Sequence, residues 1–399
     1  MHRPPDAHYS FTIPSIHDDT TLDCRIYHPD ALSKPTYSDK SVQWKRRGIV
    51  MAHPYAPMGG SYDDRVVSIV VEEFLKTGWI VGTFNFRGAH GSKGRTSWSG
   101  RPELDDYTSY AAFFVHYMCY IQPIPTADPP STPEQTPIVP QPANTVHTQS
   151  DACPVVILGG YSYGSMILRH LPPVPTILQL FSAPLAGSAA EEILLRARKL
   201  ADQSNVDWQN IARDEVRARS KTKTGYNTRP SLTIGGEETS PDKRRSSREV
   251  RRSMDGGGRL EIKTRLRSLS HRRRENTSPH VQPDTTKTAT INIPPEIRYL
   301  LLSPLTPPIS TLAAPALGYK FWAKPREGHH DVIAKHTTLA VFGDQDVFTS
   351  VKRIRDWAAQ LQAESGSRFT GVEVAGAGHF WLASHVEQTL RTTLREWGS

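Results

Sequence analysis

The sequence predicts an α/β protein with a mostly parallel central sheet and helices on both faces. Short runs of β-branched and other apolar residues alternate along the chain with helical segments, which is the pattern of βαβ units. Two of these runs, VVIL at residues 155–158 and LAVF at residues 339–342, are apolar throughout. Parallel strands that are buried on both faces have this composition.

The expected elements follow in order along the chain. Tyr9–Ile13 and Thr21–Tyr27 are predicted to form an antiparallel pair of strands. Further strands are expected at Gly48–Ala52, Trp79–Asn85, Pro154–Gly159, Arg298–Ser303, Thr338–Gly343 and Gly371–Val374. Helices are expected at Asp63–Thr77, Glu103–Met118 (with Pro102 just before it), Ser165–His170, Val351–Gln362 and Ser384–Glu396.

Two stretches have the composition of disordered insertions. Residues 122–152 are rich in Pro, Thr and Gln, and residues 221–290 carry Arg/Ser clusters and a glycine triplet. Neither stretch offers enough apolar surface to offset the entropy of ordering. Residues 188–220 instead carry an apolar stripe at helical spacing, which predicts one or two helices. These helices are interpreted either as a partial lid or as peripheral packing.

These segments divide the chain into consecutive parts. The expected division is an N-terminal half of the α/β domain at 1–121, the Pro-rich loop at 122–152, the Gly-rich turn and its helix at 153–187, the helical insertion at 188–220, the basic insertion at 221–290 and the C-terminal half at 291–399.

The positive charge of the chain is confined to the basic insertion. The formal net charge is +8, yet residues 221–280 contain 16 Lys and Arg against 7 Asp and Glu, a local net of +9. The rest of the chain therefore carries about −1, which argues against nucleic-acid binding by the folded part. The insertion is interpreted as a solvated loop, with an anionic partner, a localisation signal or a kinase target as alternatives.

The cysteines and the lengths of the apolar runs indicate the cellular compartment of the protein. The three cysteines are far apart and lack CxxC spacing, so neither a disulfide framework nor a zinc site is expected. No signal peptide or transmembrane segment is recognised. We expect a cytoplasmic protein, with a nuclear location as an alternative because of the basic insertion.

The motif GYSYG at residues 160–164 follows an apolar strand and precedes a helix. A GxSxG sequence in this setting is typical of a nucleophile elbow, in which a sharp turn projects the serine hydroxyl above the sheet. The alternative is an ordinary glycine-rich turn. The motif makes Ser162 the candidate nucleophile, and the backbone N–H of Tyr163 a candidate donor to an oxyanion.

Two later strand ends carry the residues that a serine nucleophile needs. Asp346 and Asp344 follow the strand TLAVF, and His379 follows the strand at 371–374. The order Ser, Asp, His is that of an α/β catalytic triad, in which a carboxylate orients the histidine that takes the serine proton. We expect Asp346 to be the acid, because the turn after a strand usually directs its later residue into the site.

A second oxyanion donor is expected in the loop after the strand at 48–52. This loop reads HPYAPMGG at residues 53–60, and the backbone N–H of Tyr55 or Ala56 is the candidate. The alternative is a proline-glycine turn that only connects a strand to a helix.

Three stretches of the chain resemble the α/β-hydrolase superfamily, and more narrowly a subgroup of small soluble hydrolases. HPYAPMGGSYDDRVV at 53–67 is similar to that subgroup's HPHPxxGGxMxNxVV, FNFRGAHGSKG at 84–94 to its FNFRGxGxSxG, and ELDD at 103–106 to its ExxD. The resemblance covers about 46–120, 153–170 and 296–396. It departs from the pattern at Tyr55, where the subgroup has histidine, and at residues 62–64.

The resemblance implies an α/β-hydrolase fold and a serine hydrolase that acts on an ester or related acyl compound. Its implied site residues are Ser162, Asp346 and His379 as the triad and the Tyr55 and Tyr163 amides as the oxyanion hole. It implies a small-molecule acyl substrate and no metal or organic cofactor. Alternatives are a peptidase or acyltransferase with the same triad, a non-catalytic binding scaffold, and a nucleic-acid-binding protein.

Two further features are interpreted structurally. Arg87 is expected to pair with Asp105 or Asp106 and fix its loop, with recognition of a substrate carboxylate as the alternative. The histidines of residues 329–336 lack the usual spacing of a zinc site, so a polar loop is expected there.

Overall fold

The computed structural model describes residues 5–33, 44–122, 153–224, 294–318 and 332–399. Its contacts group 1–219 with 288–399 into one compact unit and set 220–287 apart as a second. Within the second unit only residues 220–224 belong to the described part of the chain. The insertions expected to be disordered, at 122–152 and 221–290, therefore lie outside the described residues except at their first positions.

The sheet has eight strands in the order β1-β2-β4-β3-β5-β6-β7-β8. The strands are β1 (Tyr9–Pro14), β2 (Thr21–Tyr27), β3 (Arg47–Ala52), β4 (Ile80–Phe84), β5 (Val155–Tyr161), β6 (Glu296–Leu302), β7 (Thr337–Gly343) and β8 (Phe369–Val374). β2 pairs antiparallel with both β1 and β4, and all other pairs are parallel. This is the mostly parallel sheet of an α/β protein that the sequence predicted, so the α/β fold class is confirmed.

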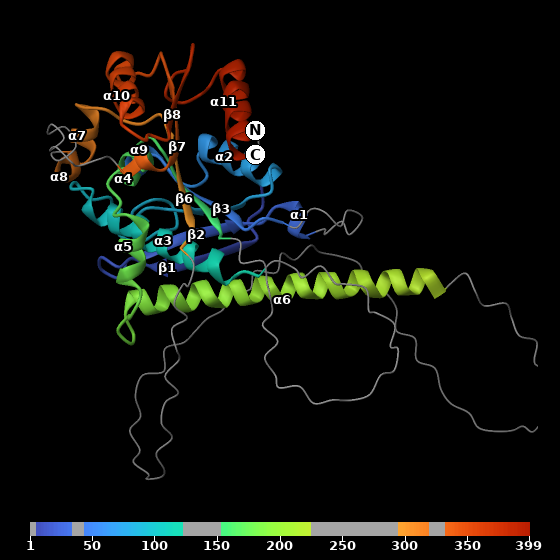
Figure 1. Ribbon diagram of the computed structural model, residues 1–399. Helices are drawn as coiled ribbons and strands as arrows, with labels where there is room; N and C mark the ends of the chain where they lie inside the picture. Colours follow the sequence, from blue (N-terminus) through green and yellow to red (C-terminus); the bar gives the residue numbers. More distant parts are fainter. Residues whose placement is uncertain (1–4, 34–43, 123–152, 225–293, 319–331) are drawn as a thin grey trace, which may run out of the picture. The chain divides into compact units, whose positions relative to one another are not determined.

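Helices cover both faces of the sheet (Figure 1), and an apolar layer lies between the sheet and the helices on each face. On one face pack α2 (Arg65–Lys76) and α11 (Ser384–Gly398), and on the other pack α3 (Arg101–Tyr120), α4 (Tyr163–Leu168) and α10 (Val351–Ala363). β4 is buried at every position, as a central strand covered on both faces should be. The chemistry of such a sheet is expected where its parallel strands end.

Helix ends differ in detail from the sequence prediction. α3 begins at Arg101, so Pro102 lies inside its first turn and not just before the helix. Proline is tolerated there because the first N–H groups of a helix have no intrahelical partner. Short helices that the sequence did not predict are α1 (Asp30–Ser33), a 3₁₀ turn (Ala56–Met58), α5 (Val174–Leu180), α7 (Ile309–Ala313), α8 (Pro315–Gly318) and α9 (Val332–Lys335). None is long enough to show a hydrophobic period.

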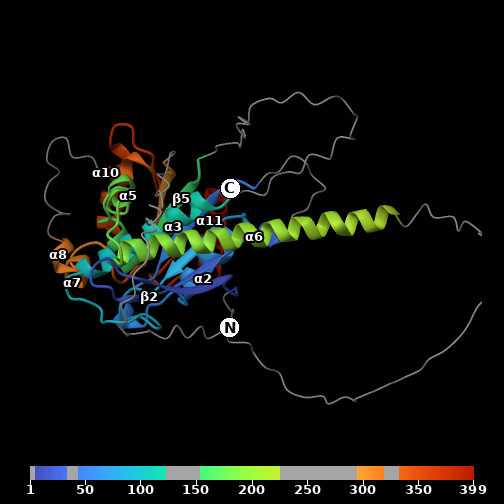
Figure 2. The ribbon, with the colours of Figure 1, turned by 90° about the horizontal axis from the view of Figure 1, so that it is seen from below.

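The helical insertion is one continuous helix, α6 (Ala189–Thr224). It runs beside α3 (Figures 1 and 2), where the hydroxyls of Ser204 and Tyr117 are 2.9 Å apart. Ser204 also contacts the Tyr9 hydroxyl of β1 at 3.1 Å. These contacts pack α6 against α3 and β1, and a lid role for this helix stays a prediction. Within the described part of the chain, no helix is long and apolar enough to cross a membrane.

Candidate active site

Ser162 occupies a sharp corner between β5 and α4. Its backbone has φ 54° and ψ −113°, a conformation that residues other than glycine rarely adopt. The corner is fastened by the Ser162 N–H, which donates to the Leu302 carbonyl at 2.9 Å, and by the Ser165 hydroxyl, which donates to the Ser162 carbonyl at 2.7 Å. This is the geometry expected of a nucleophile elbow.

The two glycines of the motif are required by close backbone approach. A Cβ atom added to Gly160 would lie 2.3 Å from the carbonyl carbon of Gly164. A Cβ added to Gly164 would lie 2.6 Å from the Ala52 carbonyl oxygen at the end of β3. The GxSxG pattern therefore reflects the tight crossing of the start of α4 over the ends of β3 and β5.

The structure brings Ser162, His379 and Asp346 together in one chain of hydrogen bonds. His379 Nε2 is 2.8 Å from Ser162 Oγ, and His379 Nδ1 is 2.6 Å from Asp346 Oδ2. All three side chains are buried. An ionised carboxylate only accepts, so Nδ1 carries the proton and Nε2 is free to accept the serine hydroxyl.

The other oxygen of Asp346 is held by its own turn. Asp346 Oδ1 accepts from the N–H groups of Phe348 and Thr349, at 2.8 and 3.1 Å. Asp344 has a different partner, because its Oδ1 accepts from the Gly376 N–H at 2.7 Å. Of the two acids after β7, the structure thus places Asp346 against the histidine and uses Asp344 to hold the turn after β8.

Sequence reasoning missed the residues that hold the backbone around His379. The buried Tyr161 phenol donates to the His379 carbonyl at 2.9 Å, and the buried Trp381 indole donates to Ser303 Oγ at 3.0 Å. Burial raises the pKa of the Tyr161 phenol, which keeps it a neutral donor. No local spacing rule reveals these pairs, because their partners are 218 and 78 positions away in the sequence.

The two expected oxyanion donors come from adjoining loops. Tyr163 is the first residue of α4, so its N–H has no partner within the helix. Tyr55 directly precedes the 3₁₀ turn at Ala56–Met58, and its ring centroid lies 5.0 Å from that of Tyr163. The structure therefore brings the side chains of the two residues into contact, and the role of their N–H groups stays a prediction.

His53 fixes the loop that contains Tyr55. This fully buried ring donates from Nδ1 to the Pro54 carbonyl at 2.6 Å and accepts at Nε2 from the Phe86 N–H at 2.9 Å. Burial lowers the pKa of His53 to about 4, so the ring is neutral. The histidine thereby connects the loop after β3 to the loop after β4.

Arg87 fixes the loop after β4, as the structural interpretation predicted. Its guanidinium binds both oxygens of Asp106, at 2.7 and 3.0 Å, and also binds Asp18 at 2.9 Å. Asp105 pairs instead with His17. Because two carboxylates already engage the guanidinium, the contacts favour a structural role over recognition of a substrate carboxylate.

The side chains of residues 62–64 hold the start of α2 against β2. The Tyr62 hydroxyl donates to Asp23 at 2.6 Å, and the Arg25 guanidinium lies over the Tyr62 ring and pairs with Asp63. Asp64 accepts from the Val66 N–H at 2.7 Å and so caps α2. Burial raises the pKa of the Asp64 carboxyl.

Two other features lie apart from this site. The described residues contain no group of three or more His, Cys, Asp or Glu side chains arranged to hold a metal ion. Residues 329–331 lie outside the described residues, and His336 Nδ1 contacts the Ile297 carbonyl.

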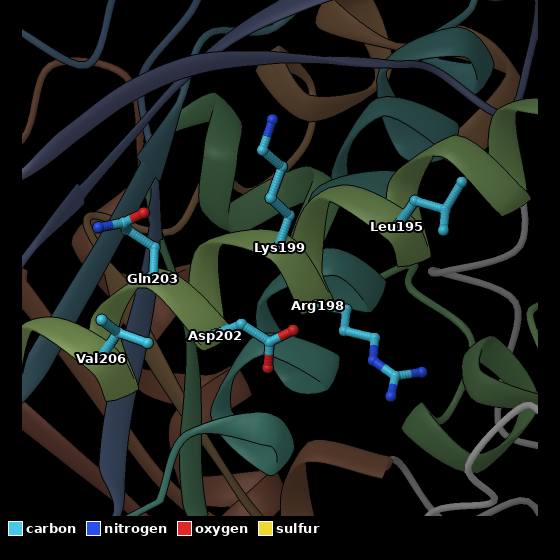
Figure 3. A pocket seen from close by; sticks show the side chains of 6 residues that line it. All are labelled: Leu195, Arg198, Lys199, Asp202, Gln203 and Val206. Carbon is cyan, nitrogen blue, oxygen red and sulfur yellow. The ribbon is translucent and has the colours of Figure 1, made fainter. Parts of the chain in front are cut away.

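Figure 3 shows an open hollow whose lining all comes from α6: Leu195, Arg198, Lys199, Asp202, Gln203 and Val206.

Comparison with known proteins finds similarity among solved structures. No protein-family model matches the chain, and no curated protein matches it significantly. An α/β serine hydrolase homologue from Coxiella burnetii matches with 13% identity and a TM-score of 0.43, covering 99% of both chains. An α/β serine hydrolase without a lid, from Xanthomonas campestris, matches with 13% identity and a TM-score of 0.42, covering 100% of this chain and 96% of that one.

Another similar structure is Est1E from Butyrivibrio proteoclasticus with ferulic acid bound, with 9% identity and a TM-score of 0.43 over 97% of both chains. All three likenesses are distant.

Proposed function

We propose that the protein is a serine hydrolase that cleaves a carboxylic ester through an acyl-enzyme. The observation that carries the proposal is the continuous chain of short contacts from Asp346 through His379 to Ser162. A serine, a neutral imidazole and a buried carboxylate in this order form the apparatus that turns a weak hydroxyl into a nucleophile.

In the first half of the reaction, Ser162 Oγ attacks the ester carbonyl carbon while its proton passes to His379 Nε2. The charge on the imidazolium is stabilised by Asp346, which already accepts the Nδ1 proton. The negative charge on the carbonyl oxygen is stabilised by the N–H groups of Tyr55 and Tyr163. When the tetrahedral intermediate collapses, His379 returns the proton to the departing alcohol, and the acyl group stays on Ser162.

In the second half, water replaces the alcohol beside the imidazole. His379 Nε2 takes a proton from this water as its oxygen attacks the acyl carbon. Collapse of the second intermediate breaks the bond to Ser162 Oγ, which recovers the proton from the imidazolium. The sum is an ester and water giving a carboxylic acid and an alcohol, and the residues supply every proton transfer.

We also propose that the chain belongs to the subgroup whose motifs are HP…GG…VV and FNFRG. It is supported by what those stretches do in the fold. His53 and the Phe86 N–H join the two loops, and Arg87 fastens the second loop to α3 through Asp106. The motif residues thus hold in place the loop that contains Tyr55.

The test is active-site labelling combined with turnover. The purified chain should react with a fluorophosphonate probe on Ser162 and hydrolyse p-nitrophenyl butyrate, and Ser162→Ala should abolish the label and lower kcat by about 10⁴-fold or more. Ser182→Ala, which changes an exposed serine that bonds only Gln179, is the matched control. Wild-type labelling and turnover in Ser162→Ala would exclude the mechanism.

A further inference from the structure

Large apolar side chains that follow Asp346 and His379 in the sequence are open to solvent. Val347 follows Asp346 directly and is 79% exposed. Phe380 and Leu382 follow His379 and are 48% and 71% exposed. The turns that carry Asp346 and His379 therefore display apolar surface, although water is the neighbour that such side chains favour least.

Two aromatic rings from these turns meet the imidazole edge to face. The centroids of Phe348 and His379 are 4.7 Å apart with an interplanar angle of 67°, and those of His379 and Phe380 are 5.4 Å apart at 86°. Phe348 and Phe380 also contact each other, with centroids 5.9 Å apart. The triad histidine is thus set into an aromatic corner formed by one ring from each turn.

The chemistry of the proposed reaction places one part of the substrate in this corner. The imidazole must reach the oxygen of the departing alcohol to return its proton, so the alcohol lies within hydrogen-bonding distance of His379 Nε2. In the proposed reaction the carbonyl oxygen is bound by the Tyr55 and Tyr163 amides and not by the imidazole. The surface beside the imidazole is therefore available to the alcohol part and not to the carbonyl oxygen.

Arg65, which contacts the backbone between Phe380 and Leu382, already has partners. The Arg65 guanidinium pairs with Glu387 and contacts the Trp381 carbonyl at 3.4 Å. It consequently offers little to a polar or anionic alcohol, whereas the exposed rings and aliphatic side chains offer apolar area.

We infer that Val347, Phe348, Phe380 and Leu382 form the binding site for the alcohol part of the substrate, and that the substrates are esters of apolar alkyl or aryl alcohols. This inference rests on the proposed function. These four residues are called the alcohol-side cluster below.

The test compares esters of one acid with two unactivated primary alcohols. Hexyl acetate and ethyl acetate share the acyl group and the type of leaving oxygen, so they differ mainly in apolar area on the alcohol. We expect kcat/KM of the full chain to be about tenfold higher for hexyl acetate, the gain from burying roughly half of the added methylenes.

Variants then locate the effect. Phe380→Ser and Leu382→Ser should each lower the ratio of kcat/KM for hexyl over ethyl acetate by about threefold or more. A ratio is unaffected by partial loss of folded protein, because both substrates report on the same active molecules. Leu195→Ser, on α6, is the matched control, since it removes a leucine that is 61% exposed and far along the chain from the site. In this control variant the ratio of kcat/KM for hexyl over ethyl acetate should equal that of the wild type.

Ethyl hexanoate, an isomer of hexyl acetate, separates the two sides of the site. The ratio of kcat/KM for ethyl hexanoate over ethyl acetate should change less in Phe380→Ser than the ratio for hexyl acetate over ethyl acetate does. Equal ratios for wild type and both cluster variants, or an equal change in Leu195→Ser, would overturn the alcohol-side inference while leaving hydrolysis intact. Absence of both fluorophosphonate labelling and ester turnover in the wild type would instead overturn the proposed function, and the inference with it.

Discussion

Two buried histidines follow strands β3 and β8, and they differ in whether their surroundings allow the ring to accept a proton. His53 bonds two backbone groups, the Pro54 carbonyl and the Phe86 N–H. His379 bonds two side chains, the Asp346 carboxylate and the Ser162 hydroxyl. In both rings each nitrogen has a partner, so burial and hydrogen-bond satisfaction do not distinguish them.

What distinguishes the two histidines is the effect of adding a proton. At His53 a second ring proton would face the Phe86 N–H, a donor, so protonation would break a bond in a buried place. At His379 the proton would come from the hydroxyl at Nε2, and the carboxylate at Nδ1 would stabilise the resulting charge. The partners of a histidine, more than its burial, therefore separate a structural ring from a candidate base.

The largest expected effect concerns His379. In His379→Gln the serine hydroxyl loses the group that takes its proton, so kcat for p-nitrophenyl butyrate should fall by about 10⁴-fold or more. His17→Gln, which removes a surface histidine paired with Asp105, should leave kcat within about twofold. Comparable activity of His379→Gln and the wild type would remove the contrast between the two rings.

The next effect separates the two acids after β7. Asp346→Asn should lower kcat by about 10³–10⁴-fold, because an amide in place of the carboxylate favours the wrong tautomer of His379 and no longer stabilises the imidazolium. Asp344→Asn keeps an oxygen for the Gly376 N–H and should lose about tenfold at most. The measurement is kcat for both variants at one pH, and a reversed ranking would assign the acid to Asp344.

A third prediction concerns the stability of the folded state and the neutral His53. The pKa of this ring is lowered from 6.5 to about 4, so between these values the unfolded chain binds a proton that the folded chain does not. The wild type should therefore lose about 3 kcal/mol of unfolding free energy through this group as the pH falls from 6.5 to 4.

The variant His53→Phe lacks this titration but leaves the Phe86 N–H without its acceptor. It should be less stable than the wild type at pH 7 by about 1–3 kcal/mol, and the deficit should shrink as the pH falls. Urea unfolding of both proteins at several pH values measures this difference. A deficit that stays constant from pH 7 to 4 would show that His53 gains its proton without resistance from the fold.

The smallest expected effect concerns the support of the His379 backbone. Tyr161→Phe removes the phenol that donates to the His379 carbonyl and should lower kcat by about tenfold, or about 1.4 kcal/mol, through looser placement of the ring. Tyr117→Phe is the matched control. It removes a buried phenol that bonds His28 and Ser204, so it should lower stability and leave kcat unchanged.

Local signals predicted the strands and the longer helices of the fold. Apolar runs located every strand of the sheet, and the glycines around Ser162 marked the elbow because only glycine fits where α4 crosses β3. The continuity of α6 was less predictable, because the stripe in the second part of 188–220 is irregular and packing against α3 supplies what periodicity does not.

By itself, the sequence determined which residue types follow which strands: a serine between glycines, two acids after one strand and a histidine after another. Only the tertiary structure decided which acid meets the histidine, that Tyr161 and Trp381 secure its loop, and that His53 is a support. The physical reason is that periodicity and turn chemistry act over a few residues. These contacts instead join atoms up to 218 positions apart, whose distances depend on sheet register and on the packing of neighbouring turns.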